Sequence, residues 1–201
     1  ARTAIDGAAR RADVIQGGIG KMRADIEVKL VSCTPEPERH IEICGREAYG
    51  STPSEGTDEV RNWIRKRIQG WEHDVLEHSW ATFHITCSRV VSHELVRHRL
   101  ASYTQRSMRF TETAVTDYVI PPEVENPVHI AWFQSRFDMA HQDYKYARKA
   151  LKYPRQTARY VLPNMTATTI MMTANFRELR HIVTMRAAKM AQPEMRVIAQ
   201  A

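Results

Sequence analysis

The sequence RHRLASYTQRSMR, residues 97–109, is the stretch on which the organisation of this chain depends. It opens with adjacent cationic side chains, Arg97, His98 and Arg99, and continues as a polar run that few apolar residues interrupt. A helix that only packs against a core does not need such a run. Guanidinium groups and short hydroxyls match the geometry of phosphate oxygens, so the stretch predicts a site that holds several anionic oxygens.

The segment before this stretch predicts a strand followed by a helix. Apolar and polar side chains alternate over residues 80–87, which is typical of a strand with one buried face. Residues 88–100 then have a helical pattern with Val91 and Leu95 facing inward, so the cationic triplet is expected near the end of that helix. The segment from there to Pro121 is predicted as a loop or an irregular extended piece.

Further strands and helices are predicted on both sides. The alternation at residues 26–32 and the β-branched run at residues 166–173 predict strands. Helices are expected over residues 36–50, 57–69, 127–151 and 175–190, with a short helix that begins at Pro154 and carries Arg159. Asn175 is expected to cap the last long helix, in which Leu179, Ile182, Val183 and Met190 are expected to face inward.

The length and composition suit one domain, because 201 residues with 43% hydrophobic content can bury a real core. Residues 1–25 contain GGIG without a preceding strand, so a flexible N-terminal arm is expected rather than a dinucleotide-binding motif, with residues 26–201 as the domain. No apolar run approaches the ~20 residues that span a bilayer, and the N-terminus lacks the apolar block of a signal peptide. A cytoplasmic protein is therefore predicted.

The arginines indicate the class of partner. The formal net charge of +6 predicts either a nucleic acid or a phosphorylated small molecule. Arg109, Arg159 and Arg186 each have apolar neighbours in the sequence, which indicates partial burial. Since a buried guanidinium needs an anion, these arginines favour a pocket. A basic nucleic-acid-binding module is the alternative from another functional class.

Other motifs are less specific. His93 and His98 are five residues apart, which turns their imidazoles about 140° from each other on a helix, so no metal site is expected there. Ser102 and Ser107 lie in no nucleophile-elbow pattern and are expected to bind phosphate rather than attack a substrate. The cluster of His and acidic residues in EHDVLEH, 72–78, fits either a polar turn or a turn that binds a cofactor.

The opening stretch resembles a known family signature. RHRLASYTQRSMR is similar to the pattern RHR-x-x-S-x-x-x-x-S-x-R of the flavin-dependent thymidylate synthases, and similarity to the family extends over most of residues 28–196. The resemblance implies an α/β (α+β) fold in which a central mixed or antiparallel sheet is flanked by long helices. It also implies that flavin is bound without a Rossmann motif.

A reaction and an assembly are implied as well. The family makes dTMP from dUMP, with the carbon from methylenetetrahydrofolate, the hydride carried by FAD, and NADPH as the reductant of the flavin. Its members are usually homotetramers whose sites are shared between chains. The resemblance therefore implies that this chain binds dUMP, FAD, NADPH and the folate as a homotetramer, with no nucleic acid or membrane partner.

Carried over by position, the resemblance implies roles for individual residues. Arg186 would lie against the uracil as the main electrostatic catalyst, because a fixed cation favours the N3-deprotonated, enolate-like ring and raises the electron density at C5. The residues implied to contact FAD are Asp74, Arg97, His98, Arg99, Gln105, Asn175, Arg177 and His181. The residues implied to contact dUMP are Glu94, Arg97, Gln105, Arg106, Ser107, Met108, Arg109, Arg159 and Arg186.

Three residues depart from the family pattern near the cofactor. Glu72 stands where a His is often found, Asp74 replaces a hydroxyl residue, and Ala48 stands where a Ser often binds FAD. The charge of Asp74 would oppose a nearby flavin phosphate. A member of the family that binds flavin or nucleotide but has lost or altered its synthase activity is therefore the alternative within the family.

Overall fold

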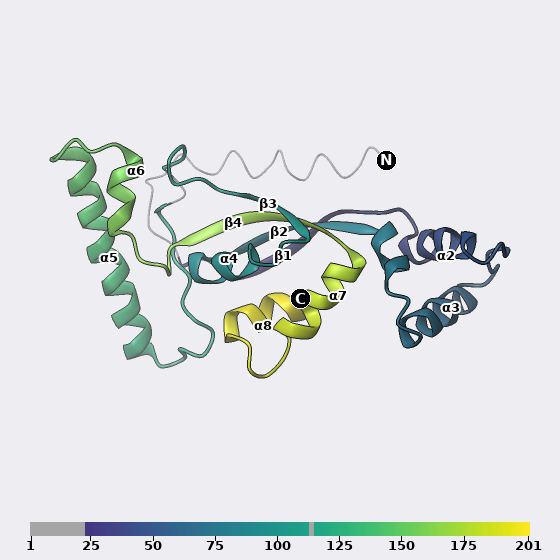
Figure 1. Cartoon of the computed structure of the whole chain (residues 1–201). Helices are drawn as coiled ribbons and strands as arrows, with labels where there is room; N and C mark the ends of the chain where they lie inside the picture. Colours follow the sequence, from purple (N-terminus) through teal and green to yellow (C-terminus); the bar gives the residue numbers. More distant parts are fainter. Residues whose placement is uncertain (1–22, 113–114) are drawn as a thin grey trace, which may run out of the picture.

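A four-stranded antiparallel sheet in the order β1–β2–β4–β3 forms the centre of the molecule (Figure 1). The computed structural model describes residues 23–112 and 115–201, so the expected arm at residues 1–25 lies almost wholly outside the described residues. The strands are β1 (Glu27–Cys33), β2 (Trp80–Ser88), β3 (Ala101–Gln105) and β4 (Ala167–Asn175). The antiparallel form of the expected α+β fold is thus confirmed.

Helices surround this sheet on one face and at both ends. Figure 1 shows α2 and α3 at one end, α5 and α6 at the other, and α4, α7 and α8 beneath one face. The bounds of the helices are α2 (Pro37–Glu47), α3 (Thr57–Gln69), η2 (Asp74–His78), α4 (Arg89–Leu95), α5 (Pro127–Lys149), α6 (Arg155–Ala158), η4 (Arg159–Val161), α7 (Phe176–Arg186) and α8 (Pro193–Gln200). In the described part of the chain, none of them is long and apolar enough to cross a membrane.

The main core lies between the sheet and the helices beneath it. β2 and β4 pair from Trp80 opposite Asn175 to Ser88 opposite Ala167, so their apolar side chains point to the same face. Helices α4, α7 and α8 cover that face with their own apolar side chains. The buried residues of this core are Ile85, Cys87, Val91, Leu95, Ile170, Met172, Ile182, Met195 and Ile198.

The segment after α4 was predicted as a loop or an irregular extended piece, but its first part, Ala101–Gln105, forms a regular edge strand, β3, on β4. Ser102 and Thr104 point outward and stay exposed, while the alternate side chains are half-buried. These two side chains lie on the face of the sheet opposite the main core, and a sheet face that is not packed on a core accommodates polar residues. The polar composition of this segment therefore concealed a strand.

The last part of the chain also differs from the prediction. The helix expected to reach residue 190 ends at Arg186, and Val183 and Met190 are 46% and 96% exposed rather than inward. A separate helix, α8, follows and buries Met195 and Ile198 in the main core. Leu179 and Ile182 do pack against that core, as expected. A second helix thus takes the place that a continuous helix was expected to fill.

Candidate functional site

The cationic triplet lies in a tight turn immediately after α4. That helix ends at Leu95, and the Tyr103 hydroxyl holds the turn by donating to the carbonyl oxygens of Leu95 (2.7 Å) and His98 (3.1 Å). The turn directs His98 inward, where it is only 7% exposed, and leaves Arg97 and Arg99 exposed. The three side chains of the triplet therefore do not share one environment.

Arg186, at the end of α7, is held by two residues of α4 and the turn after it. Its Nε donates to Nε2 of His98 at 3.0 Å, and its Nη1 donates to the Glu94 carboxylate at 2.9 Å. Nδ1 of His98 faces the Glu178 carboxylate at 3.6 Å, and the His181 ring lies 5.9 Å from the His98 ring. Burial, and then the charge of Arg186, lower the pKa of His98, against a raising effect of Glu178. His98 is therefore a neutral acceptor beside a fixed cation.

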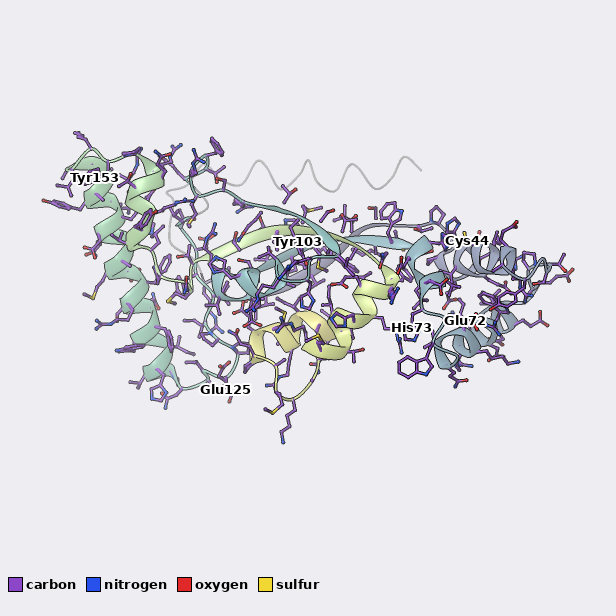
Figure 2. The ribbon with its side chains drawn as sticks, in the orientation of Figure 1. Cys44, Glu72, His73, Tyr103, Glu125 and Tyr153 are labelled. Atoms are coloured by element: carbon purple, nitrogen blue, oxygen red, sulfur yellow. The ribbon has the colours of Figure 1, made fainter. Side chains whose placement is uncertain are left out.

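A cavity of about 540 Å³ runs along α7 next to this group. His73 reaches it from the turn after α3, and Figure 2 shows this side chain between α7 and the α2–α3 pair. Two of the residues implied to contact FAD, Arg177 and His181, contribute to its wall. The residues that line the cavity are His73, Leu100, Arg177, Glu178, Arg180, His181 and Thr184.

The beginning of α7 positions two further expected residues. Asn175 caps the helix, because its Oδ1 accepts from the backbone N–H of Glu178 at 2.9 Å. Arg177 forms an ion pair with Glu77 of η2 on the exposed surface. Asn175 thus has a structural role in the helix, which was also predicted, while Arg177 already has an anionic partner.

A second group of expected residues lies at the α6 end of β4. Arg89 donates to the carbonyl oxygen of Arg106 at 3.2 Å, and burial, followed by the nearby charge of Arg159, lowers the pKa of Arg89. Ser107 forms a turn in which its hydroxyl accepts from the backbone N–H of Arg109 at 3.2 Å. The positive charges of Arg89 and Arg159 therefore lie close to each other.

Arg109 belongs to the same end of the molecule. Its guanidinium lies 5.5 Å from the centre of the Phe110 ring, a cation–π contact. It also lines an open basic cavity of about 370 Å³. The residues that line this cavity are Arg109, Phe110, Arg148, Pro154, Arg155 and Gln156.

Two expected contact residues are engaged inside the protein. The Gln105 amide donates to the hydroxyls of Ser92 (2.8 Å) and Thr168 (3.3 Å), which ties β3 to α4 and β4. Met108 is buried against Val115 and against residues of α5 and α6. These side chains anchor the loop that follows β3, so their direct role here is to position Ser107 and its neighbours.

The described part of one chain does not bring all expected residues together. Glu94, His98, His181 and Arg186 form one group under the sheet, while the arginines around Arg109 form another beyond the start of β4. Arg109 lies with α6 at one end of the sheet, whereas α7, which carries Arg186, begins at the other end of β4 (Figure 1). The two groups therefore present separate surfaces in one protomer.

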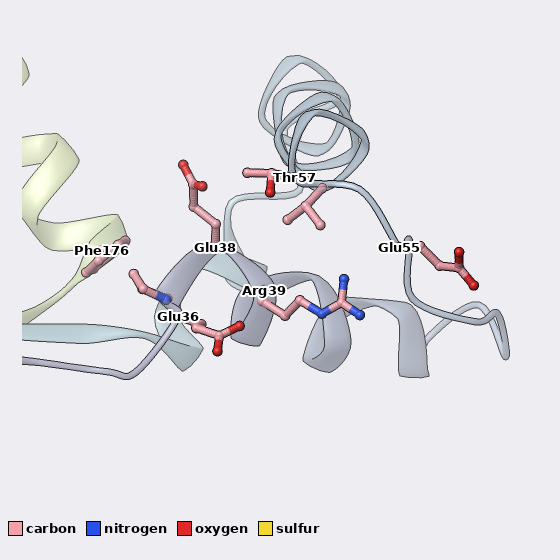
Figure 3. Close-up of a pocket in the computed structure, with 8 residues that line it drawn as sticks. Glu36, Glu38, Arg39, Glu55, Thr57 and Phe176 are labelled. Atoms are coloured by element: carbon pink, nitrogen blue, oxygen red, sulfur yellow. The ribbon is translucent and has the colours of Figure 1, made fainter.

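A further cavity of about 490 Å³ lies between α2, α3 and the start of α7 (Figure 3). Glu36, Glu38 and Glu55 contribute carboxylates to its wall, and Arg39 donates to the carbonyl oxygen of Ser54. No residue implied to bind FAD or dUMP lines it. Its negative charge opposes a phosphorylated ligand, so it is not the candidate site.

Comparison with known proteins decides the family. A family model described as "Thymidylate synthase complementing protein" matches residues 29–201. The flavin-dependent thymidylate synthase of Sulfolobus acidocaldarius is 40% identical over 186 residues, which cover 87% of this chain and 70% of that protein. The chain belongs to the flavin-dependent thymidylate synthase family. The synthase of Mycobacteroides abscessus is 37% identical over 177 residues, covering 79% of this chain and 71% of that protein.

Solved structures share the fold of this family member. Thymidylate synthase X (ThyX) from Helicobacter pylori, determined with FAD and dUMP, has a TM-score of 0.74 at 22% identity and covers 87% of this chain and 90% of that chain. The UMP/dUMP methylase PolB from Streptomyces cacaoi, bound with 5-Br dUMP, has a TM-score of 0.75 at 21% identity, with coverage of 89% and 88%. At these identities the likeness establishes the fold.

Of the residues that depart from the family pattern, Figure 2 shows Glu72 beside His73, near the α2–α3 pair. Glu72 accepts a hydrogen bond from the Tyr49 hydroxyl and pairs with Arg67 at 3.2 Å, so its charge is balanced by α3. Asp74 begins η2 and is exposed, and Ala48 follows the end of α2, also exposed. The thymidylate synthase pattern is thus altered at the α2–α3 end of the cavity, not around Arg186.

Two residues of the site were missed by sequence reasoning. Glu178 is buried beside His98, and Arg89 lies near Arg159. An acidic residue in the first turn of a helix is common, because it interacts favourably with the helix dipole. Nothing local therefore distinguished Glu178, and the position of Arg89 follows only from the packing of α4 on the sheet.

Proposed function

We propose that this chain catalyses the reductive methylation of dUMP to dTMP, with methylenetetrahydrofolate as carbon donor, FAD as hydride carrier and NADPH as reductant. Residues 26–201 would form the synthase domain. Membership of the thymidylate synthase family supports this function. The observation that carries it is the fixed position of Arg186 between His98 and Glu94.

Arg186 is suited to polarise a uracil ring. Its side chain is 21% exposed, so it is partly shielded from water and still reachable by a ligand. A guanidinium held in such a place stabilises negative charge more strongly than one in bulk water. Set against the pyrimidine, it would favour the enolate-like form whose C5 attacks the one-carbon donor.

The residues along α7 fit FAD. Arg177, Arg180 and His181 place cationic or polar groups on one cavity, which suits the pyrophosphate of a dinucleotide, and the His73 ring offers a flat surface to an aromatic group. Arg97, His98, Arg99 and Asn175 would complete the flavin site, with Gln105 and Asp74 at its margins. FAD, when bound there, supplies the hydride that completes the methyl group of dTMP.

The basic group at the other end of β4 would hold the phosphate of dUMP. Arg106, Ser107, Arg109 and Arg159 supply guanidinium and hydroxyl donors for it, and the buried Met108 holds their loop in place. Because one protomer keeps this group apart from Arg186, we infer that a neighbouring subunit completes each site. A homotetramer, as in the family, would provide such sites.

The flavin content of the purified protein tests this function. We expect the absorbance of oxidised flavin, bleaching of that absorbance by NADPH under anaerobic conditions, and release of tritium from dUMP labelled at C5 when the folate is present. Bound flavin without tritium release would support the reading in which synthase activity is lost. Protein that cannot be reconstituted with FAD and binds nucleic acid would contradict the proposal.

A further inference from the structure

The hydrogen bond between Arg186 and His98 determines where the proton of His98 resides. Nε of arginine can only donate, so Nε2 of His98 must accept at the observed 3.0 Å. A neutral imidazole that accepts at Nε2 carries its proton on Nδ1. That nitrogen faces the Glu178 carboxylate at 3.6 Å, a distance for electrostatic attraction rather than a formed hydrogen bond.

Glu178 is unusual because its carboxylate is buried. It is 5% exposed, and an ionised carboxylate is costly to bury unless it is paired. Among the residues described, His98 is the one basic side chain within 4.0 Å of this carboxylate. The burial of Glu178 therefore makes sense if the His98 ring is its partner.

We propose that Glu178 is a positioning residue, which selects the Nδ1–H tautomer of His98 and thereby orients Arg186. This inference rests on the proposed function for the role of Arg186 toward uracil. Glu178 attracts the proton on Nδ1, and Nε2 is left free to accept from Arg186. Glu94 holds Nη1 from the other side, so Nη2, which has no hydrogen-bond partner among the described residues, can meet a ligand.

The opposite tautomer would break this arrangement. A proton on Nε2 would face the N–H of Arg186, and two donors repel each other. The other groups near the ring do not replace Glu178: His181 meets it edge-on at 5.9 Å, and the Tyr103 hydroxyl contacts the backbone carbonyl of His98. Glu178 is thus the group that distinguishes the two tautomers.

Nitrogen NMR of the histidine rings tests this directly. In protein labelled with ¹⁵N-histidine, the two tautomers give different shifts for Nδ1 and Nε2, and the His98 signals are assigned by their loss in His98→Gln. The full-length protein, as purified and without nucleotide, is compared with Glu178→Gln and Glu178→Ala. Glu42→Gln is the matched control, because Glu42 is a fully buried carboxylate that pairs with Arg46 of its own helix, α2.

We expect the parent protein and Glu42→Gln to show the Nδ1–H tautomer. Glu178→Ala should shift His98 toward Nε2–H and weaken dUMP binding about tenfold, the effect of losing roughly one hydrogen bond to Arg186. Glu178→Gln should rescue part of both properties, because the dipole of its amide oxygen still attracts the proton on Nδ1 but the full negative charge is lost. If Glu178 only stabilised the fold, its replacement would not change the tautomer of His98.

The outcomes separate this inference from the proposed function. An Nε2–H tautomer in the parent protein overturns the inference, and so does a Glu178→Ala variant with unchanged tautomer. A shifted tautomer with unchanged dUMP affinity overturns the link to Arg186. If the parent has the Nδ1–H tautomer but does not bind dUMP, the proposed function fails while the assignment of Glu178 to His98 stands.

Discussion

Arg186 has partners of two kinds, a carboxylate and a neutral imidazole, and each restricts it differently. The Glu94 carboxylate balances its charge, whereas Nε2 of His98 fixes the direction of one N–H. A ligand that binds here meets a guanidinium that is already oriented, so little reorganisation is needed. In the proposed reaction, two residues from a different segment would therefore influence the chemistry of this arginine.

Replacement of Arg186 measures this electrostatic role. We expect Arg186→Ala to lower turnover of dUMP about 100- to 1,000-fold, the usual effect of removing one preorganised donor. Arg186→Lys should recover only part of the loss, since lysine keeps the charge but not the planar fork. Steady-state kinetics and dUMP binding check this, with the exposed Arg65→Ala on α3 as control. Parent-like turnover in both Arg186 variants would exclude the role.

His98 predicts a pH dependence of stability. Its pKa is lowered from the ordinary 6.5 by burial and by Arg186, so the folded state binds fewer protons than the unfolded state. The contribution of neutral, buried His98 to the free energy of unfolding is therefore fully present above about pH 6.5. It is lost as the pH falls through the lowered pKa of His98.

The corresponding measurement is denaturant unfolding at pH values from about 4 to about 8, a range that brackets the pKa of an ordinary histidine. His98→Gln should show a shallower decline of the unfolding free energy on the acidic side than the parent protein. The exposed His129→Gln on α5 should keep the parent curve. An unchanged curve in His98→Gln would show that another group is responsible.

Among the elements, α4 depends on a contact with the end of the chain. Ser88 caps this helix by accepting from the N–H of Val91 at 3.3 Å. The Glu194 carboxylate of α8 in turn accepts from the backbone N–H and the hydroxyl of Ser88, both at 2.7 Å. Since α4 carries Glu94 and leads into the turn of His98, α8 helps to hold the site.

Glu194→Ala is predicted to destabilise the protein by about 2–3 kcal/mol, because it leaves two buried donors of Ser88 without an acceptor. Ser88→Ala should cost about 1 kcal/mol, the usual effect of losing a cap. Denaturant unfolding of both single variants and the double variant gives their coupling energy. Strict additivity would mean that Glu194 and Ser88 do not act together.

At the scale of the whole molecule, the proposed sharing of sites requires surfaces on which subunits can meet. Figure 1 shows helices beneath one face of the sheet and at both of its ends, and antiparallel sheets often leave the other face for solvent or a partner. Helix α5 also exposes Val128, Trp132, Met139 and Tyr146. These surfaces are available for the subunit contacts that shared sites require.

Mixed assemblies test the sharing of sites. If Arg109 and Arg186 of one site come from different chains, coexpression of Arg109→Ala with Arg186→Ala should restore activity to at most about a quarter of the parent, because random mixing leaves that fraction of sites intact. Coexpression of His98→Ala with Arg186→Ala should restore nothing, since these two residues contact each other within one chain. Tritium release measures both mixtures. Equal activity in the two mixtures would contradict shared sites.

The sequence by itself determined the elements whose pattern is local. The alternation at 80–87 and the β-branched run at 166–173 became β2 and β4, and Asn175 caps α7 as predicted. Spacing and capping act over a few residues, so they can be recognised without the fold. The RHR signature likewise indicated the family, because its residues lie close together in the sequence.

Only the tertiary structure decided the remaining features. β3 needs β4 as its neighbour, and α8 buries Met195 against residues far away in the sequence. The burial of His98, the role of Glu178 and the separation of Arg109 from Arg186 depend on which segments fold against each other. Such contacts join residues that are distant in the chain, and their energies exist only once the chain has closed around them.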